Sequence, residues 1–200
     1  MGRTAVVDYG AGNLMSVTNA LKYLGEEWII TSDNGEIERS DRIILPGVGA
    51  FPAAMRFLKE KGFESVLVEQ VKKKPFLGIC LGMQMLFDES EEIETTAGLG
   101  LIGGRIKRVD TDLKLPHIGW NSLRFHNPSP LTEGVPEGSY VYFVHSFAAY
   151  ADREEDLVAS VDYGTQVTAI VGNDHVFGCQ FHPEKSGEVG LTMLKNFCSI

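Results

Sequence analysis

Cys80 lies in a setting that is typical of a nucleophile. It stands between Gly78 and Gly82, directly after the short apolar run 76–79, and a second apolar run, 81–87, follows it. The first run predicts a buried strand and the second a buried helix, so we expect the thiol on a sharp strand-to-helix turn. In such a nucleophile elbow the reactive atom projects from the turn, and glycine neighbours leave room for the backbone. A lone cysteine is more often an inert buried residue, but the paired glycines favour a nucleophile.

A cysteine nucleophile needs a group that moves protons, and the sequence offers one at His182 and Glu184. Side chains two residues apart share a face in an extended segment. Pro183 between them fixes its own φ and disfavours helix at His182, which predicts an extended geometry here. A carboxylate beside an imidazole fixes its tautomer and stabilises its charged form. Such a pair in a loop is ordinary by itself, but together with a cysteine elbow it predicts the triad Cys80, His182 and Glu184.

The elements that position these groups alternate between strand and helix in the first half of the chain. Strands are predicted at 4–7, 28–30, 42–45 and 76–79, and helices at 14–24, 51–61 and 64–73. This alternation predicts a largely parallel central sheet that is flanked by helices. Ligands bind at the carboxyl ends of the strands in such sheets, where both Cys80 and the segment 46–49 lie. We therefore expect these two loops to share one site.

The second half of the chain has a different composition. After Glu94, glycines and prolines separate short strand-like runs, of which the clearest are 140–147, 167–171 and 176–181. This half is predicted to be β-rich and to extend the sheet with partly antiparallel strands, before a helix returns at about 187–197. Because there is no repeat, linker or low-complexity tract, we expect residues 1–200 to form a single α/β domain.

Composition and charge narrow the classes of function. The 200 residues include 27 Asp or Glu and 18 Lys or Arg, and the formal net charge of -9 argues against nucleic acid or a membrane surface as partner. The three cysteines, Cys80, Cys179 and Cys198, have no CxxC spacing, which is typical of free thiols in a reducing compartment. No apolar run reaches membrane-spanning length, and the run 5–7 is too short for a signal peptide. We expect a soluble, cytoplasmic protein.

Other kinds of site have less support. Gly10 and Gly12 resemble the start of a dinucleotide-binding fingerprint, but Met15 occupies its third glycine position. The remaining histidines show no metal-ligand spacing and are expected to be hydrogen-bonded structural residues, namely His117, His126, His145 and His175. No serine lies in an elbow, so a serine hydrolase would lack its nucleophile. We expect neither a metal nor a cofactor.

Taken together, the motifs resemble those of the class I (triad) glutamine amidotransferases, which have a flavodoxin-like fold. The matching stretches run from end to end of the chain, at 8–13, 45–51, 78–87, 116–121, 142–146 and 177–187. Most members carry histidine after the second elbow glycine, where Met83 stands here. Met83, Trp120 and Asn121 resemble more narrowly the glutaminase subunits that act in histidine biosynthesis.

The resemblance implies a role for each matching residue. Cys80 would attack the side-chain amide of glutamine and form a thioester, while His182 would protonate the departing ammonia and then activate water. Glu184 would orient His182. Backbone N–H groups would form an oxyanion hole, drawn from Leu81 and from Gly47, Val48 and Gly49. The backbone groups of the substrate glutamine would be held by Gln84, Glu92 and Ser146.

A partner is also implied. The ammonia would pass to a separate (β/α)8-barrel cyclase subunit in a heterodimer, because no barrel is present in this sequence. The surface expected to meet the cyclase carries Asn13, Trp120, Asn121 and Lys185. Gly47 and Gly49 further predict control by the partner, since a glycine peptide reorients cheaply and an oxyanion donor could point away at rest.

Two alternatives remain open. One is a glutaminase subunit of another synthase, such as anthranilate or aminodeoxychorismate synthase, against which Met83, Trp120 and Asn121 argue. The other is a non-catalytic, flavodoxin-like binding module, whose cysteine would show no selective reactivity.

Overall fold

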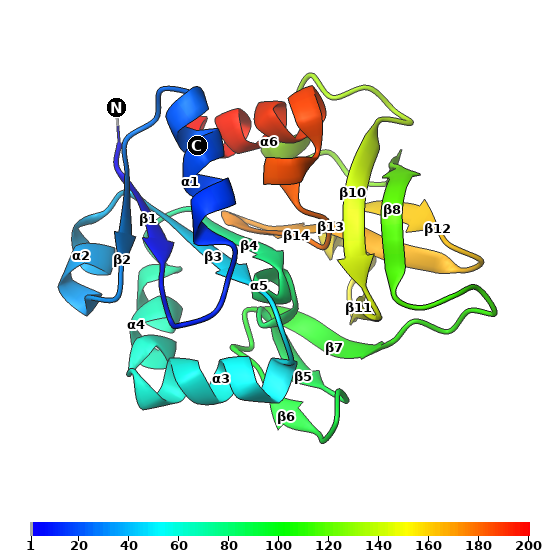
Figure 1. Cartoon of the computed structure of the whole chain (residues 1–200), viewed down its shortest axis with the longest axis horizontal. Coiled ribbons are helices and arrows are strands. Elements are labelled where there is room, and N and C mark those ends of the chain that lie inside the picture. Colours follow the sequence, from blue (N-terminus) through cyan, green and yellow to red (C-terminus); the bar gives the residue numbers. More distant parts are fainter. Residues whose placement is uncertain (1) are drawn as a thin grey trace.

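The computed structural model describes residues 2–200, and its central element is an eight-stranded sheet (Figure 1). In spatial order the strands are β2 (Trp28–Thr31), β1 (Thr4–Val7), β3 (Arg42–Gly47), β4 (Phe76–Cys80), β14 (Val176–Cys179), β13 (Gln166–Asn173), β12 (Leu157–Asp162) and β9 (Arg124–Phe125). Neighbours from β2 to β14 are parallel, whereas the pairs from β14 to β9 are antiparallel. The predicted fold class, a largely parallel sheet with a partly antiparallel extension, is confirmed.

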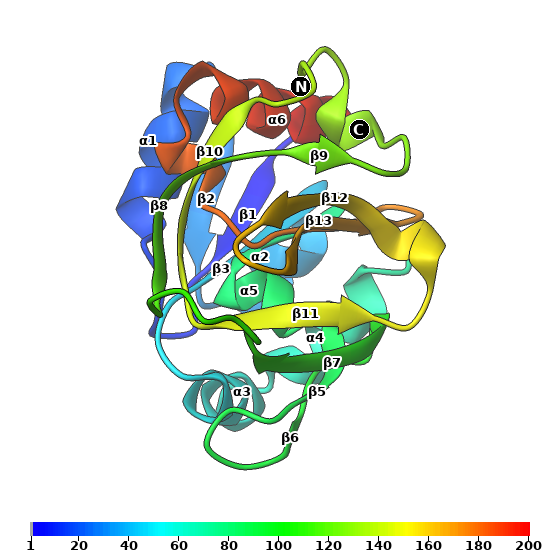
Figure 2. The ribbon, with the colours of Figure 1, turned by 90° about the vertical axis from the view of Figure 1, so that its right-hand side faces the viewer.

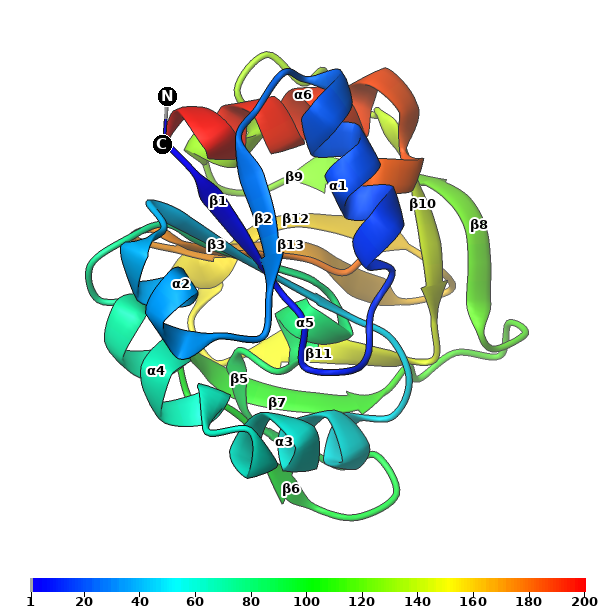
Figure 3. The ribbon, with the colours of Figure 1, turned by 60° about the vertical axis from the view of Figure 1, so that its left-hand side comes forward.

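Helices cover both faces of this sheet (Figure 3). One face packs against α1 (Leu14–Tyr23) and α6 (Gly187–Ser199), and the other against α2 (Asn34–Arg39), α3 (Phe51–Glu60) and α4 (Phe63–Gln70). Successive strand residues point to opposite faces, so Val6 joins the first core while Ala5 and Val7 join the second. The sequence did not predict α2, because six residues are too few to establish a helical period. Its start is nevertheless marked by Asp33, whose side chain accepts a hydrogen bond from the Glu36 N–H at 2.8 Å.

Five strands of the β-rich half, together with β5, form two further sheets instead of extending the central one (Figure 2). One sheet pairs β8 (His117–Ser122) with β10 (Tyr140–His145), and the other contains β11 (Phe147–Ala151), β7 (Ile102–Arg108), β5 (Phe87–Ser90) and β6 (Thr96–Ala97). The predicted strand 140–147 is therefore two strands in different sheets, divided at Ser146. Short 3-10 turns complete the fold at Pro130–Thr132, Glu154–Asp156 and Pro183–Lys185.

The predicted helix after Cys80 is much shorter than expected. Helix α5 covers only Leu81–Gln84, and β5 begins at Phe87. The backbone carbonyls that follow α5 accept hydrogen bonds from the segment 99–102 instead of from a continuing helix, at 2.8 to 3.0 Å for Met85 and Leu86. A run that is apolar at every position fits a buried helix or a buried strand equally well, which is why the sequence did not separate the two. Within residues 2–200, no helix has the length and apolar character to cross a membrane.

Candidate active site

The backbone at Cys80 is strained and tightly packed. Cys80 ends β4 with φ 55° and ψ -112°, a conformation that costs a non-glycine residue about 1–3 kcal/mol and that clusters at functional sites. A Cβ on Gly82 would lie 1.7 Å from the carbonyl oxygen of Leu45, and one on Gly78 would lie 2.5 Å from the carbonyl oxygen of Gly82. Both glycines are therefore required for α5 to approach β3 and β4 so closely. Cys80 as a whole residue is only 8% exposed.

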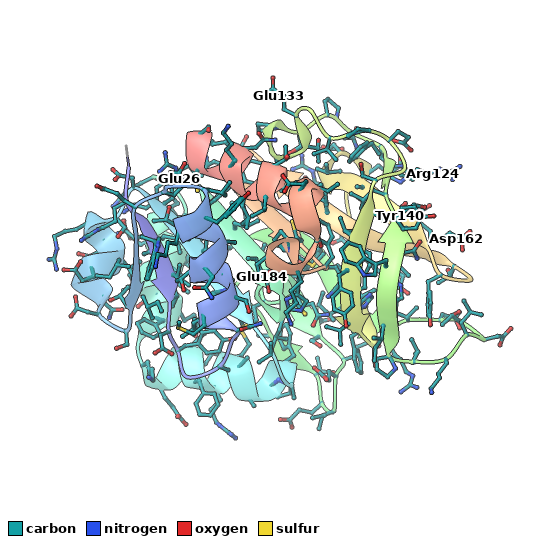
Figure 4. All side chains as sticks on the ribbon, turned by 45° about the horizontal axis from the view of Figure 1, so that its top comes forward. Glu26, Arg124, Glu133, Tyr140, Asp162 and Glu184 are labelled. Atoms are coloured by element: carbon teal, nitrogen blue, oxygen red, sulfur yellow. The ribbon has the colours of Figure 1, made fainter. Side chains whose placement is uncertain are left out.

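His182 and Glu184 meet Cys80 because β14 lies beside β4 in parallel, so that both strands end at the same edge of the sheet. The Nδ1 of His182 donates to Oε1 of Glu184 at 2.8 Å, and the carboxylate is almost completely buried. His182 has the predicted extended backbone, with φ -99° and ψ 97°, but the extended geometry does not continue, because residues 183–185 form a 3-10 turn that brings the two side chains together. Figure 4 shows Glu184 in the middle of the molecule, whereas the labelled Glu26, Glu133 and Asp162 lie at its periphery.

Opposing effects act on the pKa of His182. Burial disfavours the imidazolium form and lowers the pKa, but hydrogen bonds and charge interactions with Cys80 and Glu184 outweigh it and raise the pKa to about 9. His182 therefore carries a proton on both ring nitrogens at neutral pH. With Nδ1 held by Glu184, the other N–H faces the thiol.

A cavity of about 440 Å³ opens in front of this pair. Its lining includes Cys80 and His182, together with most of the other residues predicted for the site, namely Val48, Gly49, Leu81, Gln84, Glu92 and Ser146. Two predicted residues do not line it. Glu184 lies behind His182, and Gly47 is buried where a Cβ would come within 2.7 Å of the Gly82 nitrogen. Gly47 is thus needed for close packing, whereas Val48 and Gly49 border the cavity.

Comparison with known proteins identifies the family. Residues 5–200 match the family described as "Glutamine amidotransferase class-I". The chain belongs to this family. It is 54% identical over 195 residues to "Imidazole glycerol phosphate synthase subunit HisH" of Bacillus cereus (strain ATCC 14579), with 96% of this chain and 92% of the relative covered. A protein of the same name from Bacillus anthracis (strain A0248) is 51% identical over the same shares of both chains.

Solved structures agree on the fold of this class I amidotransferase. PurLQS from Thermotoga maritima has a TM-score of 0.76 at 22% identity and covers 100% of this chain and 99% of its own. A glutamine amidotransferase from the same organism has a TM-score of 0.67 at 18% identity, with 99% of this chain and 83% of its own covered. At such low identity the likeness is one of fold alone.

Two side chains give the amidotransferase cavity an acceptor-rich wall. Both amide hydrogens of Gln84 are used, because its Nε2 donates to the Phe147 carbonyl and to Oε1 of Gln180, each at 3.0 Å. The Oε1 of Gln84 is therefore the atom of this amide that is available to accept a hydrogen bond from a ligand. The Oε2 of Glu92 accepts from the Phe51 N–H at 2.8 Å, which fixes this carboxylate at the cavity. An ammonium group is the partner that such acceptors favour.

Several lining residues were not predicted from the sequence, namely Arg108, Pro116, Val144, His145 and Phe147. Arg108 ends β7, and no motif around it indicated a site. The prediction that the four other histidines are hydrogen-bonded is confirmed, since they contact one another, Ser160 Oγ or backbone carbonyls. Burial lowers the pKa of both His117 and His145 to about 4, so both are neutral at pH 7. Among residues 2–200, no group of three or more acidic, histidine or cysteine side chains could hold a metal ion.

The four residues predicted to meet a partner lie on neighbouring elements. Trp120 on β8 is 55% exposed and packs edge-on against Tyr142 of β10, with 6.0 Å between ring centroids. Asn121 follows it, and its Nδ2 donates to the Asp162 carbonyl at 2.8 Å. Asn13 precedes α1, and Lys185 is exposed in the 3-10 turn that α1 and β10 both contact. An exposed indole is a typical anchor for a protein partner.

Proposed function

We propose that this chain is the glutaminase subunit of imidazole glycerol phosphate synthase. It hydrolyses L-glutamine to glutamate and ammonia, and the ammonia passes to a separate (β/α)8-barrel cyclase that makes imidazole glycerol phosphate and aminoimidazole carboxamide ribotide. One arrangement supports this most strongly: the thiol of Cys80 and the protonated imidazole of His182 open into the same cavity. The 54% identity to a curated subunit of this enzyme supports the choice of synthase.

The first half of the reaction forms a thioester. The thiolate form of Cys80, which is the nucleophilic form of a cysteine, attacks the side-chain amide carbon of glutamine, and the carbonyl oxygen takes up negative charge. N–H groups of Leu81 and of the segment 48–49 stabilise that charge, each by about 2.7–4 kcal/mol. The C–N bond then breaks as the imidazolium of His182 gives its proton to the departing nitrogen, and ammonia leaves.

The second half releases glutamate. His182 is neutral after giving up its proton, so it can remove a proton from water as the resulting hydroxide attacks the thioester carbon. The C–S bond breaks, and the sulfur of Cys80 returns to its starting state. Glu184 holds the imidazole ring in place and stabilises its charged form through both steps.

The acceptor wall of the cavity orients the substrate. We place the α-ammonium group of glutamine against Oε1 of Gln84 and the carboxylate of Glu92, with Ser146 beside the remaining backbone groups. The side-chain amide then extends toward Cys80. A cavity of about 440 Å³ is within the usual range for a small-molecule site.

Control by the partner follows from the segment after β3. Gly49 has φ 100°, with open space where a Cβ would stand, so its peptide is free to reorient. We propose that one oxyanion donor is correctly placed only when the cyclase binds the surface formed by Asn13, Trp120, Asn121 and Lys185. Loss of one donor lowers the rate about a hundred- to a thousandfold, which is enough to silence the isolated subunit. The three free cysteines are consistent with a cytoplasmic location.

The deciding experiment compares two ammonia sources in the complex with the cyclase. In Cys80→Ala, glutamine-dependent synthesis should be lost while added ammonium salt still supports synthesis, because only glutamine hydrolysis needs the thiol. Retained glutamine-dependent turnover would exclude Cys80 as the nucleophile. A wild-type chain that activates anthranilate synthase instead would show that the partner is a different synthase.

A further inference from the structure

A chain of buried hydrogen bonds leads from the sheet that carries Trp120 to the thiol of Cys80. It begins on β8 with Nδ1 of His117, which lies 3.2 Å from Nε2 of His145. The Nδ1 of His145 lies 2.8 Å from the Phe147 carbonyl oxygen, which also accepts from Gln84.

The chain of hydrogen bonds then crosses to the elbow. Gln84 donates to Oε1 of Gln180, and Nε2 of Gln180 lies 4.0 Å from the sulfur of Cys80. At 4.0 Å this last contact is long even for a hydrogen bond to sulfur.

Each hydrogen bond in this network has only one direction. A carbonyl oxygen can only accept, so Nδ1 of His145 carries the proton. Because His145 is neutral, its Nε2 is an acceptor, and Nδ1 of His117 must be the donor. Oε1 of Gln180 accepts from Gln84, which leaves the amide NH₂ of Gln180 facing the sulfur. The reverse orientation would place a carbonyl oxygen against a nucleophile that becomes negative.

Water has little access to this network. Gln180 is 0% exposed, and Gln84, His117 and His145 are all buried. A buried polar group that loses its partner is costly, so Gln84 keeps the Gln180 amide in a single orientation, and His145 holds the position of the Phe147 carbonyl that Gln84 needs. The orientation at Cys80 is therefore fixed by residues that do not touch the thiol.

We propose that Gln180 is a positioning residue that holds the Cys80 sulfur toward the substrate through its amide N–H. Gln84 fixes the orientation of that amide, while His145 and His117 hold in place the Phe147 carbonyl to which Gln84 donates. The role of Gln180 rests on the proposed role of Cys80 as nucleophile. The distant end of the network lies on β8, three residues before Trp120, so this positioning is joined to the surface proposed for the cyclase.

Alkylation of Cys80 by iodoacetamide tests the near end. With the sites of modification read by mass spectrometry, Cys80 of the wild-type chain should react first, since it lines the cavity, whereas Cys179 and Cys198 do not and their pKa values are raised by burial. Gln180→Met keeps the length of the side chain but removes the donor, and should slow the reaction about fivefold, as expected for one lost hydrogen bond. Gln180→Glu should slow it further, because it places a carboxylate against the sulfur.

His117→Phe tests the distant end without touching the site. Phenylalanine preserves ring stacking against Phe143 and Tyr163 but removes the donor to His145. Alkylation should slow at least about twofold, and kcat for glutamine should fall in the cyclase complex with little change in KM. The matched control is His126→Phe, which removes an imidazole bonded to Ser160 outside the network and should leave both rates unchanged.

Nitrogen NMR of the wild-type chain with labelled histidines shows which ring nitrogen of each imidazole carries the proton, and it needs no substitution in the network. At pH 7, both His117 and His145 should carry their proton on Nδ1. A proton on Nε2 of either ring would overturn the proposed direction of the network. Wild-type alkylation rates in both Gln180→Met and His117→Phe would overturn the positioning role while leaving the glutaminase intact. Failure of wild-type Cys80 to react selectively would instead overturn the proposed function.

Discussion

Replacing Glu184 by glutamine should change the stability of the protein in a way that depends on pH. The substitution keeps the size of the side chain and an acceptor oxygen for Nδ1 of His182, but it removes the buried negative charge. Because His182 is itself buried, its imidazolium form depends on the charges around it. Without the carboxylate, we expect the pKa of His182 to fall from about 9 toward its ordinary value of about 6.5.

The magnitude follows from this shift. A pKa of about 9 in the folded state, against about 6.5 when unfolded, corresponds to about 3 kcal/mol of folding free energy. Since the pKa is raised on folding, this stabilisation is complete below about pH 6.5 and is lost as the pH rises through about 9. Cys80 and Glu184 both contribute, so Glu184→Gln should cost about 2 kcal/mol at pH 6 and close to nothing at pH 9.5.

Urea denaturation at these two pH values measures the effect. The difference between wild type and variant isolates this interaction, because groups that titrate elsewhere cancel between the two proteins. Glu188→Gln is a suitable control, since Glu188 is exposed in the first turn of α6 and should show no such pH dependence. An equal difference at pH 6 and pH 9.5 would refute the assignment of a charged His182 that is stabilised by Glu184.

Three further changes have defined outcomes. Because the pKa values of His117 and His145 are lowered to about 4 on folding, the free energy of unfolding should fall as the pH drops from about 6.5 to 4, by up to about 3 kcal/mol for each ring. This fall should be smaller in His117→Phe than in the wild type, as measured by urea denaturation of each protein at pH 7 and pH 4.5. Gly82→Ala should lower the free energy of unfolding by about 3 kcal/mol or more, because the added methyl group would overlap the Leu45 carbonyl. An unchanged urea midpoint for this variant would contradict the packing described around Gly82. Lys185→Glu should weaken cyclase binding in a titration while the circular dichroism spectrum is unchanged, and wild-type affinity would remove Lys185 from the proposed interface.

The sequence predicted the part of the fold that depends on local pattern. The strand before Cys80 is continuously apolar and the glycines around it are spaced for a tight turn, so the elbow was visible without the structure. The parallel half of the sheet followed from the alternation of strand and helix. The proximity of His182 to Cys80 was also expected, because a His-x-Glu pattern supplies the proton-moving group that a cysteine elbow needs, whereas the parallel pairing of β14 with β4 that produces it was not predicted.

What the sequence left undetermined depends on pairing between distant segments. Whether the residues after Gln84 continue as helix is decided by hydrogen bonds from the segment 99–102, which no local period reveals. The division of the β-rich half into separate sheets has the same origin. The role of Gln180 depends on the orientation of its amide, which is fixed by a residue 96 positions away in the sequence. Arg108 reaches the cavity only because β7 lies in a sheet that was not predicted.

The order of strands in the central sheet bears on how the enzyme is made. β4 and β14 are neighbours in the sheet, yet the side chains that meet there, Cys80 and Gln180, are 100 residues apart in the chain. During synthesis the amino-terminal strands and helices emerge first, so the thiol is present long before β14 and His182 leave the ribosome. Because β14 is the last strand of the central sheet in the chain, its pairing with β4 cannot form until nearly all of the chain has been made, and closing so long a loop is slow. Under the proposed mechanism, a nascent chain therefore carries Cys80 without His182, and it cannot release ammonia from glutamine until β14 has paired with β4.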